Sequence, residues 1–224
     1  MKYELFLANK LYSGWGLRVW LLLKHFDIAF EQTVIPLYTS EHSHFKETHP
    51  PARQFPTLAV ALPDARRVIW DSIAITEFLA DTHLDKDFWP QDVMARAAAR
   101  SLCCELHSGF KALRSKMPVN LKRSYQTFKP DEETQADIAR VTDLWAWVRK
   151  SFPSSGPYLF GSELTVADAY FAPVASRFRT YSIELAERDK KYSDLLLSHP
   201  AVVEYFNEAK SETWVLEHNE FDLD

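Results

Sequence analysis

The stretch RQFPTLAVALPDARRVIWDSIAITEFLAD, Arg53–Asp81, carries the signals of a strand, a turn, a second strand and a helix in succession. Phe55-Pro56 leads into TLAVAL, an apolar run of strand length, and Pro63-Asp64-Ala65 is typical of a turn before the returning strand Arg67–Trp70. After Asp71-Ser72, apolar residues recur at helical spacing. The stretch therefore predicts a β-hairpin followed by an amphipathic helix.

Two positions in this stretch are suited to holding a ligand. The helix N-terminus at Asp71-Ser72 presents unpaired backbone N–H groups and a positive dipole end, which together can hold a carboxylate. Pro56 precedes a strand, where a cis bond would turn the preceding backbone toward a ligand. The hairpin and helix thus predict a binding site as well as a fold.

The chain before this stretch shows alternating strand and helix signals. Tyr3–Ala8 and Phe30–Pro36 are predicted strands, and Leu17–Phe26 has apolar residues at helical spacing. The polar, His-rich residues of the 40s favour a loop or a weak helix. The resulting order, β-α-β then β-β-α, predicts a small mixed sheet of thioredoxin type covered by helices. No C-x-x-C motif occurs, which argues against disulfide exchange.

From about Met94 onward the pattern is that of successive helices. Met94–Ser115 and Glu132–Ser151 are predicted long helices, and residues 118–129 between them have no clear period. A further helix opens at Leu164–Asp168, where Thr165 and Asp168 have the spacing of a capping box, and a last one runs from Ser198-His199-Pro200 to about Lys210.

The two halves define the predicted organisation, an α/β domain followed by an all-α domain. We expect a thioredoxin-like N-terminal domain at 1–82, a polar linker at 83–93 that contains Pro90, and a helical-bundle C-terminal domain at 94–224. A chain of 224 residues is long enough to bury the core that this organisation needs.

Composition narrows the function classes. The formal net charge of −5 and the lack of Lys/Arg clusters argue against nucleic-acid binding, and no apolar run approaches a membrane span. The adjacent pair Cys103-Cys104 is poorly placed for a disulfide, which favours a reducing, cytoplasmic setting. His42, His44 and His49 have no metal-ligand spacing, so we expect a solvated loop and no metal site.

The loop from Asn9 to Gly16 lies between the first predicted strand and the first helix, where ligands bind in α/β folds. Ser13 in this loop has two interpretations. Its hydroxyl can donate to a bound thiolate and lower the thiol pKa with help from the helix dipole, or it can simply cap the helix.

These motifs together resemble the glutathione transferases, broadly the bacterial serine-type enzymes similar to the zeta and theta classes. The run N-K-x-Y-S-x-W-x-L-R is similar to their opening, and the resemblance extends over both predicted domains. It implies that Ser13 is the catalytic, thiol-activating residue and that glutathione is the co-substrate. The implied glutathione-binding residues are Gln54, Phe55, Pro56, Asp71 and Ser72.

The resemblance assigns parts of the tripeptide to these residues. The backbone of Phe55 before the cis-proline would pair with the cysteinyl part, and Asp71-Ser72 would receive the γ-glutamyl end. Gln54 would lie near the glycyl end, although Lys is frequent there in relatives. The candidate residues of the electrophile pocket are Tyr12, Trp15, His107, Phe110 and Lys111, and Tyr12 is also a rival of Ser13 for the thiol.

The resemblance implies a cytoplasmic homodimer that transfers glutathione to a small hydrophobic electrophile, a reaction typical of detoxification. Two alternatives remain open. The first is a glutathione-dependent isomerase of the maleylacetoacetate isomerase type or a thiol peroxidase, although Gly14 and Gly16 replace the further Ser or Cys of zeta-class relatives. The second is a noncatalytic binding module on the same fold.

Overall fold

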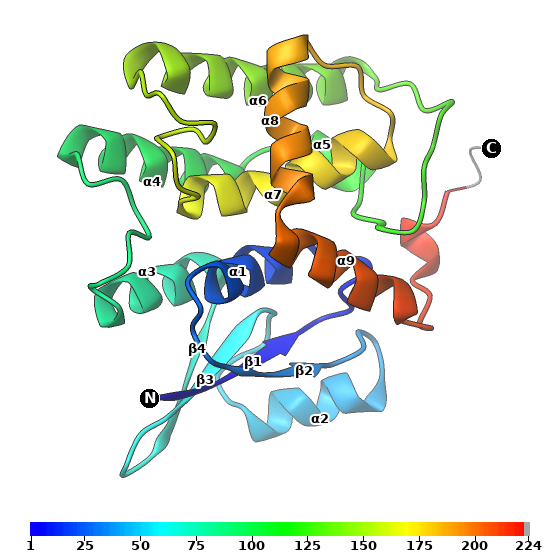
Figure 1. Ribbon diagram of the computed structural model, residues 1–224. Helices are drawn as coiled ribbons and strands as arrows, with labels where there is room; N and C mark the ends of the chain where they lie inside the picture. The colour runs from blue at the N-terminus through cyan, green and yellow to red at the C-terminus, as the bar shows by residue number, and fades with distance from the viewer. Residues whose placement is uncertain (222–224) are drawn as a thin grey trace.

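A mixed four-stranded sheet lies in the lower part of the molecule in Figure 1, which shows a computed structural model whose described residues are 1–221. The strand order is β2-β1-β3-β4; β1 pairs in parallel with β2, and the β1–β3 and β3–β4 pairs are antiparallel. The predicted hairpin and mixed sheet are confirmed. The strands are β1 (Lys2–Leu7), β2 (Glu31–Val34), β3 (Thr57–Ala61) and β4 (Arg66–Trp70).

Helices cover both faces of this sheet. In Figure 1, α1 (Gly14–His25) and α3 (Ser72–Thr82) lie above the sheet, and α2 (Ser40–Thr48) lies below it. Phe45 of α2 packs on Phe6 and Ala59 in a small separate cluster. The His-rich stretch is therefore a regular helix, which Thr39 begins by accepting the His42 N–H.

The chain after α3 forms the helical half expected from the sequence. Its central helix is α7, which packs on α1, α4 and α8, and Trp145 of α6 fills the space against Phe171 of α7 and Tyr192 of α8. The helices are α4 (Val93–Ser108), α5 (Lys111–Lys116), α6 (Glu132–Ser151), α7 (Val166–Thr180), α8 (Glu187–Ser198) and α9 (Pro200–Ser211), followed by the short 3-10 helix η1 (Glu217–Asn219).

The predicted capping box at the start of α7 is present. The buried Asp168 carboxylate accepts the Thr165 N–H at 2.9 Å, and the Thr165 side chain meets the backbone N–H of Asp168. The same carboxylate also accepts the Leu159 N–H and the Tyr192 hydroxyl. Burial raises the pKa of Asp168, although these bonds favour the charged form.

The helical half differs from the sequence prediction in two places. The expected helix Met94–Ser115 is broken at Gly109-Phe110, because Phe110 takes a positive φ of 55° and begins α5. Its apolar period continues across the break, so the pattern alone does not reveal it. Helix α8 was not predicted, because its first turns are almost entirely charged.

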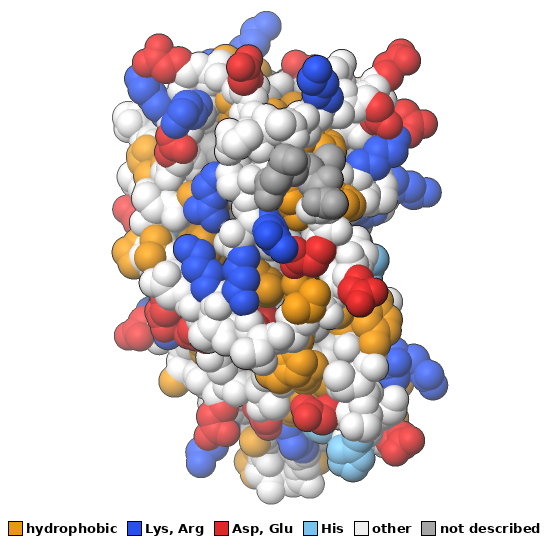
Figure 2. All heavy atoms as spheres, turned by 90° about the vertical axis from the view of Figure 1, so that its right-hand side faces the viewer, with side chains coloured by type: hydrophobic (Ala, Val, Ile, Leu, Met, Phe, Trp, Pro, Cys, Tyr) orange, Lys and Arg blue, Asp and Glu red, His pale blue; other side chains and the backbone are white. Residues whose placement is uncertain are grey.

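The surface carries both signs of charge. Figure 2 shows Asp and Glu side chains interspersed with Lys and Arg, with hydrophobic side chains exposed between them. Within residues 1–221, no helix combines the length and apolar character needed to cross a bilayer.

Candidate active site

Ser13 stands at the N-terminus of α1, at the end of the loop that follows β1. It is the N-cap residue by position, with φ −112° and ψ 107°, but its side chain makes no capping hydrogen bond. The hydroxyl of this half-buried residue is therefore not used by the helix. That leaves it available to a ligand beside the positive end of the α1 dipole.

The glycines around Ser13 allow α1 to approach its neighbours closely. A Cβ at Gly14 would lie 2.8 Å from the Pro173 Cβ of α7, and one at Gly16 would lie 2.7 Å from a methyl group of Leu7. Real Cβ atoms do not pack this tightly, so larger residues would push α1 away from α7 or β1. This packing gives a physical reason for glycine at both positions.

The Phe55–Pro56 peptide bond is cis, as the resemblance implies, and Pro56 itself is buried. The Thr57 hydroxyl donates to the Gln54 carbonyl at 2.7 Å and closes the turn before β3. Gln54 and Phe55 lie on the wall of the same cavity as Ser13.

Asp71 begins α3 in an uncommon backbone conformation, with φ 78° and ψ 128°. One carboxylate oxygen accepts the Ile73 N–H at 2.9 Å, and the other lies 3.1 Å from Nε2 of His107 on α4. The next residue, Ser72, is buried and accepts a long hydrogen bond from the Tyr170 hydroxyl at 3.4 Å. Burial raises the pKa of Tyr170 to about 12, so its hydroxyl stays protonated at neutral pH.

These elements enclose a cavity of about 490 Å³. Its wall brings together seven residues expected from the sequence, from both halves of the molecule: Ser13, Trp15, Gln54, Phe55, Asp71, Ser72 and His107. Five further residues were not predicted there: Ala8, Leu37, His42, Arg53 and Arg114.

Three of the expected pocket residues lie elsewhere. The Tyr12 side chain is turned to the C-terminal segment, where its hydroxyl donates to Glu220 at 2.6 Å. Burial and this contact raise the Tyr12 pKa to about 12. Phe110 lines a separate small pocket that also includes Trp15, and Lys111 is exposed at the start of α5. All three of these residues are absent from the described wall of the cavity that Ser13 lines.

His42 corrects the expectation of a solvated His-rich loop. It lies in the first turn of α2, accepts the Tyr38 N–H and packs against the Phe55 ring at 5.6 Å between centroids. Only the helix α2, whose period is weak in the sequence, brings this histidine to the cavity. No group of three or more potential metal ligands occurs among residues 1–221.

Two arginines, Arg18 and Arg114, lie over the Trp15 ring on the helical side of the cavity, and a third, Arg177, lines a small pocket that also includes Trp15. Arg18 is buried between the rings of Trp15 and Tyr170, whose centroids lie 4.4 and 4.5 Å from its Cζ atom. Its Nε and Nη1 atoms have no hydrogen-bond partner. Arg114 lies on the cavity wall and donates to the His107 carbonyl. Arg177 is half-buried, and desolvation, together with a smaller effect of repulsion from Arg18, lowers its pKa to about 9. No ion pair found within residues 1–221 involves any of the three.

Comparison with known proteins shows the family to which this chain belongs. The chain matches the family models "Glutathione S-transferase, N-terminal domain" at residues 12–82 and "Glutathione S-transferase, C-terminal domain" at residues 131–208. A probable maleylacetoacetate isomerase of Caenorhabditis elegans is 30% identical over 174 residues, which cover 77% of each chain. The maleylacetoacetate isomerase of Rattus norvegicus is 27% identical over 176 residues, which are 77% of this chain and 76% of the rat protein.

Solved structures with the same fold include a glutathione transferase homolog from Burkholderia with bound glutathione. It has a TM-score of 0.69 and 19% identity, over 95% of this chain and all of that chain. A maleylacetoacetate isomerase from Anaeromyxobacter dehalogenans, with bound dicarboxyethyl glutathione and citrate, has a TM-score of 0.63 and 21% identity, over 100% of this chain and 98% of its own. On the two family models and the C. elegans relative together, the chain belongs to the glutathione S-transferase family.

Proposed function

We propose that this chain is a glutathione transferase in which the Ser13 hydroxyl stabilises the glutathione thiolate for attack on a small electrophile. The observation that carries the proposal is the shared cavity. Ser13, with a hydroxyl that makes no helix-capping bond, faces the same space as Gln54, Phe55 and Asp71-Ser72. The solved relative from Burkholderia, whose structure contains glutathione, supports the choice of co-substrate.

In this proposal the tripeptide spans the cavity. The ammonium group of the γ-glutamyl part would pair with the Asp71 carboxylate. The α-carboxylate of the same γ-glutamyl part would accept hydrogen bonds from N–H groups at the start of α3. The backbone of Phe55 would pair with the cysteinyl part, and Gln54 would lie near the glycyl end. These contacts would hold the sulfur near Ser13 and the N-terminus of α1.

The proposed reaction depends on ionisation of the glutathione thiol. A free thiol is mostly protonated at neutral pH, and only the thiolate is a strong nucleophile. A hydrogen bond from Ser13 and the α1 dipole favour the thiolate, so the proton leaves to solvent. The sulfur forms a bond to an electrophilic carbon held near Trp15 and His107, and the displaced electron pair departs with the leaving group.

The test is the Ser13→Ala variant, with the ultraviolet absorbance of bound thiolate followed as a function of pH. Loss of a hydrogen bond to a charged group costs about 1.5–3 kcal/mol, so the thiol midpoint should rise by about one to two pH units. Ser13→Thr keeps a hydroxyl and is the matched control. An unchanged midpoint in Ser13→Ala, with a shift in Tyr12→Phe, would transfer the role to Tyr12.

A glutathione-dependent isomerase acting on a diacid is the second candidate function. The arginines around Trp15 favour it, because Arg114 lies on the cavity wall with Arg18 and Arg177 behind it, and carboxylates would balance these charges. The relatives named as maleylacetoacetate isomerases also support it. Parallel assays with a cis-alkene diacid, an organic hydroperoxide and an aryl halide separate isomerase, peroxidase and conjugating activities.

A further inference from the structure

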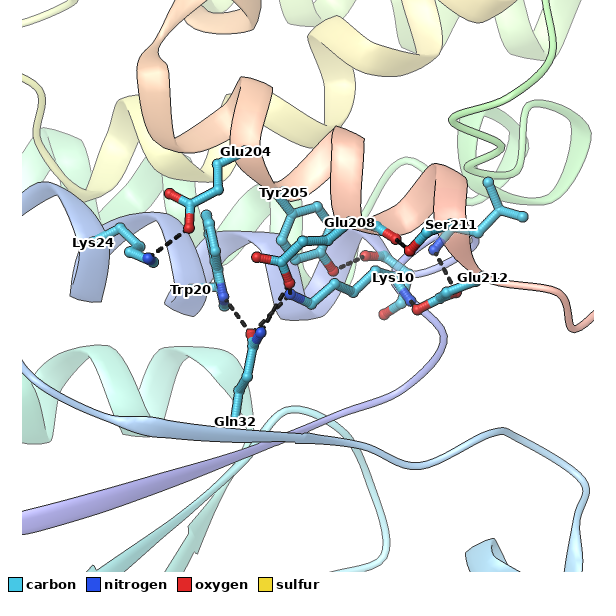
Figure 3. A network of polar contacts seen from close by, with 11 residues as sticks. Lys10, Trp20, Lys24, Gln32, Glu204, Tyr205, Glu208, Ser211 and Glu212 are labelled. Atoms are coloured by element: carbon cyan, nitrogen blue, oxygen red, sulfur yellow. Dashed lines mark hydrogen bonds and ion pairs between the residues drawn. The ribbon is translucent and has the colours of Figure 1, made fainter.

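The loop that carries Ser13 is held, residue by residue, by the C-terminal part of the chain. Figure 3 shows the part of this network that involves α9. Lys10 is 1% exposed, although it is a lysine; its Nζ donates to Glu208 of α9 and to Gln32 of β2. The Lys10 Nζ atom also lies 4.8 Å from the centroid of the Trp20 ring and 4.9 Å from that of the Tyr205 ring.

Glu212, the residue after α9, makes the central contact. One carboxylate oxygen accepts the Lys10 N–H at 2.8 Å, and the other accepts the Leu11 N–H at 3.1 Å. The residue is only 8% exposed. Burial raises the pKa of this carboxyl, and the two backbone hydrogen bonds counter that effect by favouring the carboxylate.

The C-terminal part of the chain also holds the next two loop residues, Tyr12 and Ser13. The Tyr205 hydroxyl of α9 donates to the Ser13 carbonyl at 3.3 Å, and Tyr12 donates to Glu220. The segment 205–220 therefore contacts every residue from 10 to 13. The Ser13 side chain itself makes no capping bond, so these contacts to its neighbours and to its own carbonyl set where its hydroxyl lies.

We propose that Glu212 is a positioning residue, which holds the backbone of the Ser13 loop and thereby places the Ser13 hydroxyl at the glutathione sulfur. This inference rests on the proposed function. Without the carboxylate, two buried N–H groups lose their acceptors, and the backbone two residues before Ser13 must shift to find others. A shift of about 1 Å at a catalytic group is enough to lower turnover by about 100-fold.

The experiment compares Glu212→Gln with Glu204→Gln in the full chain. Glutamine has nearly the same shape as glutamate, but its amide NH₂ group cannot accept a hydrogen bond. One of the two backbone N–H groups therefore loses its acceptor. Glu204 lies on the same helix, where it pairs with Lys24 at the surface, and none of the hydrogen bonds described for residues 10–13 involves it. Each variant is assayed for the pH midpoint of the bound thiolate and for kcat and KM with glutathione.

We expect Glu212→Gln to raise the thiolate midpoint and to lower kcat by roughly 10- to 100-fold, with a much smaller change in KM, because Phe55 and Asp71 lie on other elements. Glu204→Gln should match the wild type. If Glu212→Gln does not fold, Tyr205→Phe replaces it: the ring packing stays, the bond to Ser13 is lost, and the midpoint should move in the same direction.

Two results are informative in different ways. If the wild-type complex shows no thiolate, the proposed function fails and this inference fails with it. If the wild type ionises glutathione and the folded variants have its midpoint and its kcat, the inference is overturned while the proposed function stands.

Discussion

At the residue scale, Asp71 combines two side-chain contacts with an uncommon backbone conformation. It begins α3 by accepting the Ile73 N–H, it has a φ of 78°, and it reaches His107 on α4. Asp71→Ala loses the cap and keeps a Cβ at a positive φ, so we expect a loss of about 1 kcal/mol in the free energy of unfolding. Asp71→Gly loses the same cap but adopts this φ freely, and should lose only a few tenths of a kcal/mol.

Urea unfolding of the two variants tests this prediction, and glutathione affinity provides an internal comparison. Both lack the carboxylate, so they should lose affinity equally while differing in stability. A glycine variant less stable than the alanine variant would contradict a role for the backbone conformation. Neither the φ angle nor the contact with His107 is visible in the local sequence, although the capping role is.

At the scale of elements, α9 is attached to the N-terminal half at both ends. Its start meets α1 through two half-buried histidines. His199 Nδ1 accepts the Ala201 N–H at 3.2 Å, so its proton is on Nε2, which donates to His25 Nδ1 at 3.2 Å. Its other end leads to Glu212 and the Ser13 loop. The helix thus connects the end of α1 to its beginning.

This histidine pair makes stability depend on pH. Burial lowers the pKa of His25, and burial together with the charge of His25 lowers that of His199, from an ordinary value of 6.5. As the pH falls through 6.5, these two histidines take up protons in the unfolded chain before they do so in the folded chain. The free energy of unfolding therefore decreases as the pH falls below 6.5. We expect a melting temperature lower at pH 5.5 than at pH 7.5, with a smaller difference in His25→Gln.

The exposed His44 provides the matched control, because His44→Gln should keep the wild-type pH dependence. If His25→Gln retains the full difference between the two pH values, the dependence arises from other groups. His42 and His49, whose pKa values burial also lowers, would then be the next to examine, because they act in the same direction.

At the scale of the whole molecule, one hydrophobic core runs through both halves. It includes Leu5 and Trp20 beside the sheet and Trp145 and Phe171 among the helices. Helix α1 contacts α7 and α9 as well as α3. We therefore predict a single cooperative unfolding transition in guanidinium chloride, with coincident far-UV circular dichroism and tryptophan fluorescence curves at one protein concentration. Two separated transitions would show that the halves unfold independently.

The sequence by itself determined what depends on neighbouring residues. Hydrophobic period and turn residues predicted the hairpin in Arg53–Asp81 and helix α6, and the Thr165/Asp168 spacing predicted the capping box. The order of motifs identified the family and the Ser13, Phe55 and Asp71 positions that share a cavity. The domain limits, the homodimer and the cytoplasmic location stay predictions.

Only the tertiary structure decided what depends on contacts between distant residues. The apolar period cannot show that α4 ends at Ser108, that Tyr12 turns away to Glu220, or that His42 and Arg114 reach the cavity. Glu212 is a further case, because it meets the loop 201 residues away in the chain. Helix period and capping are local, whereas the acceptor of a buried N–H is chosen by packing; the position of the Ser13 hydroxyl is therefore a property of the folded chain.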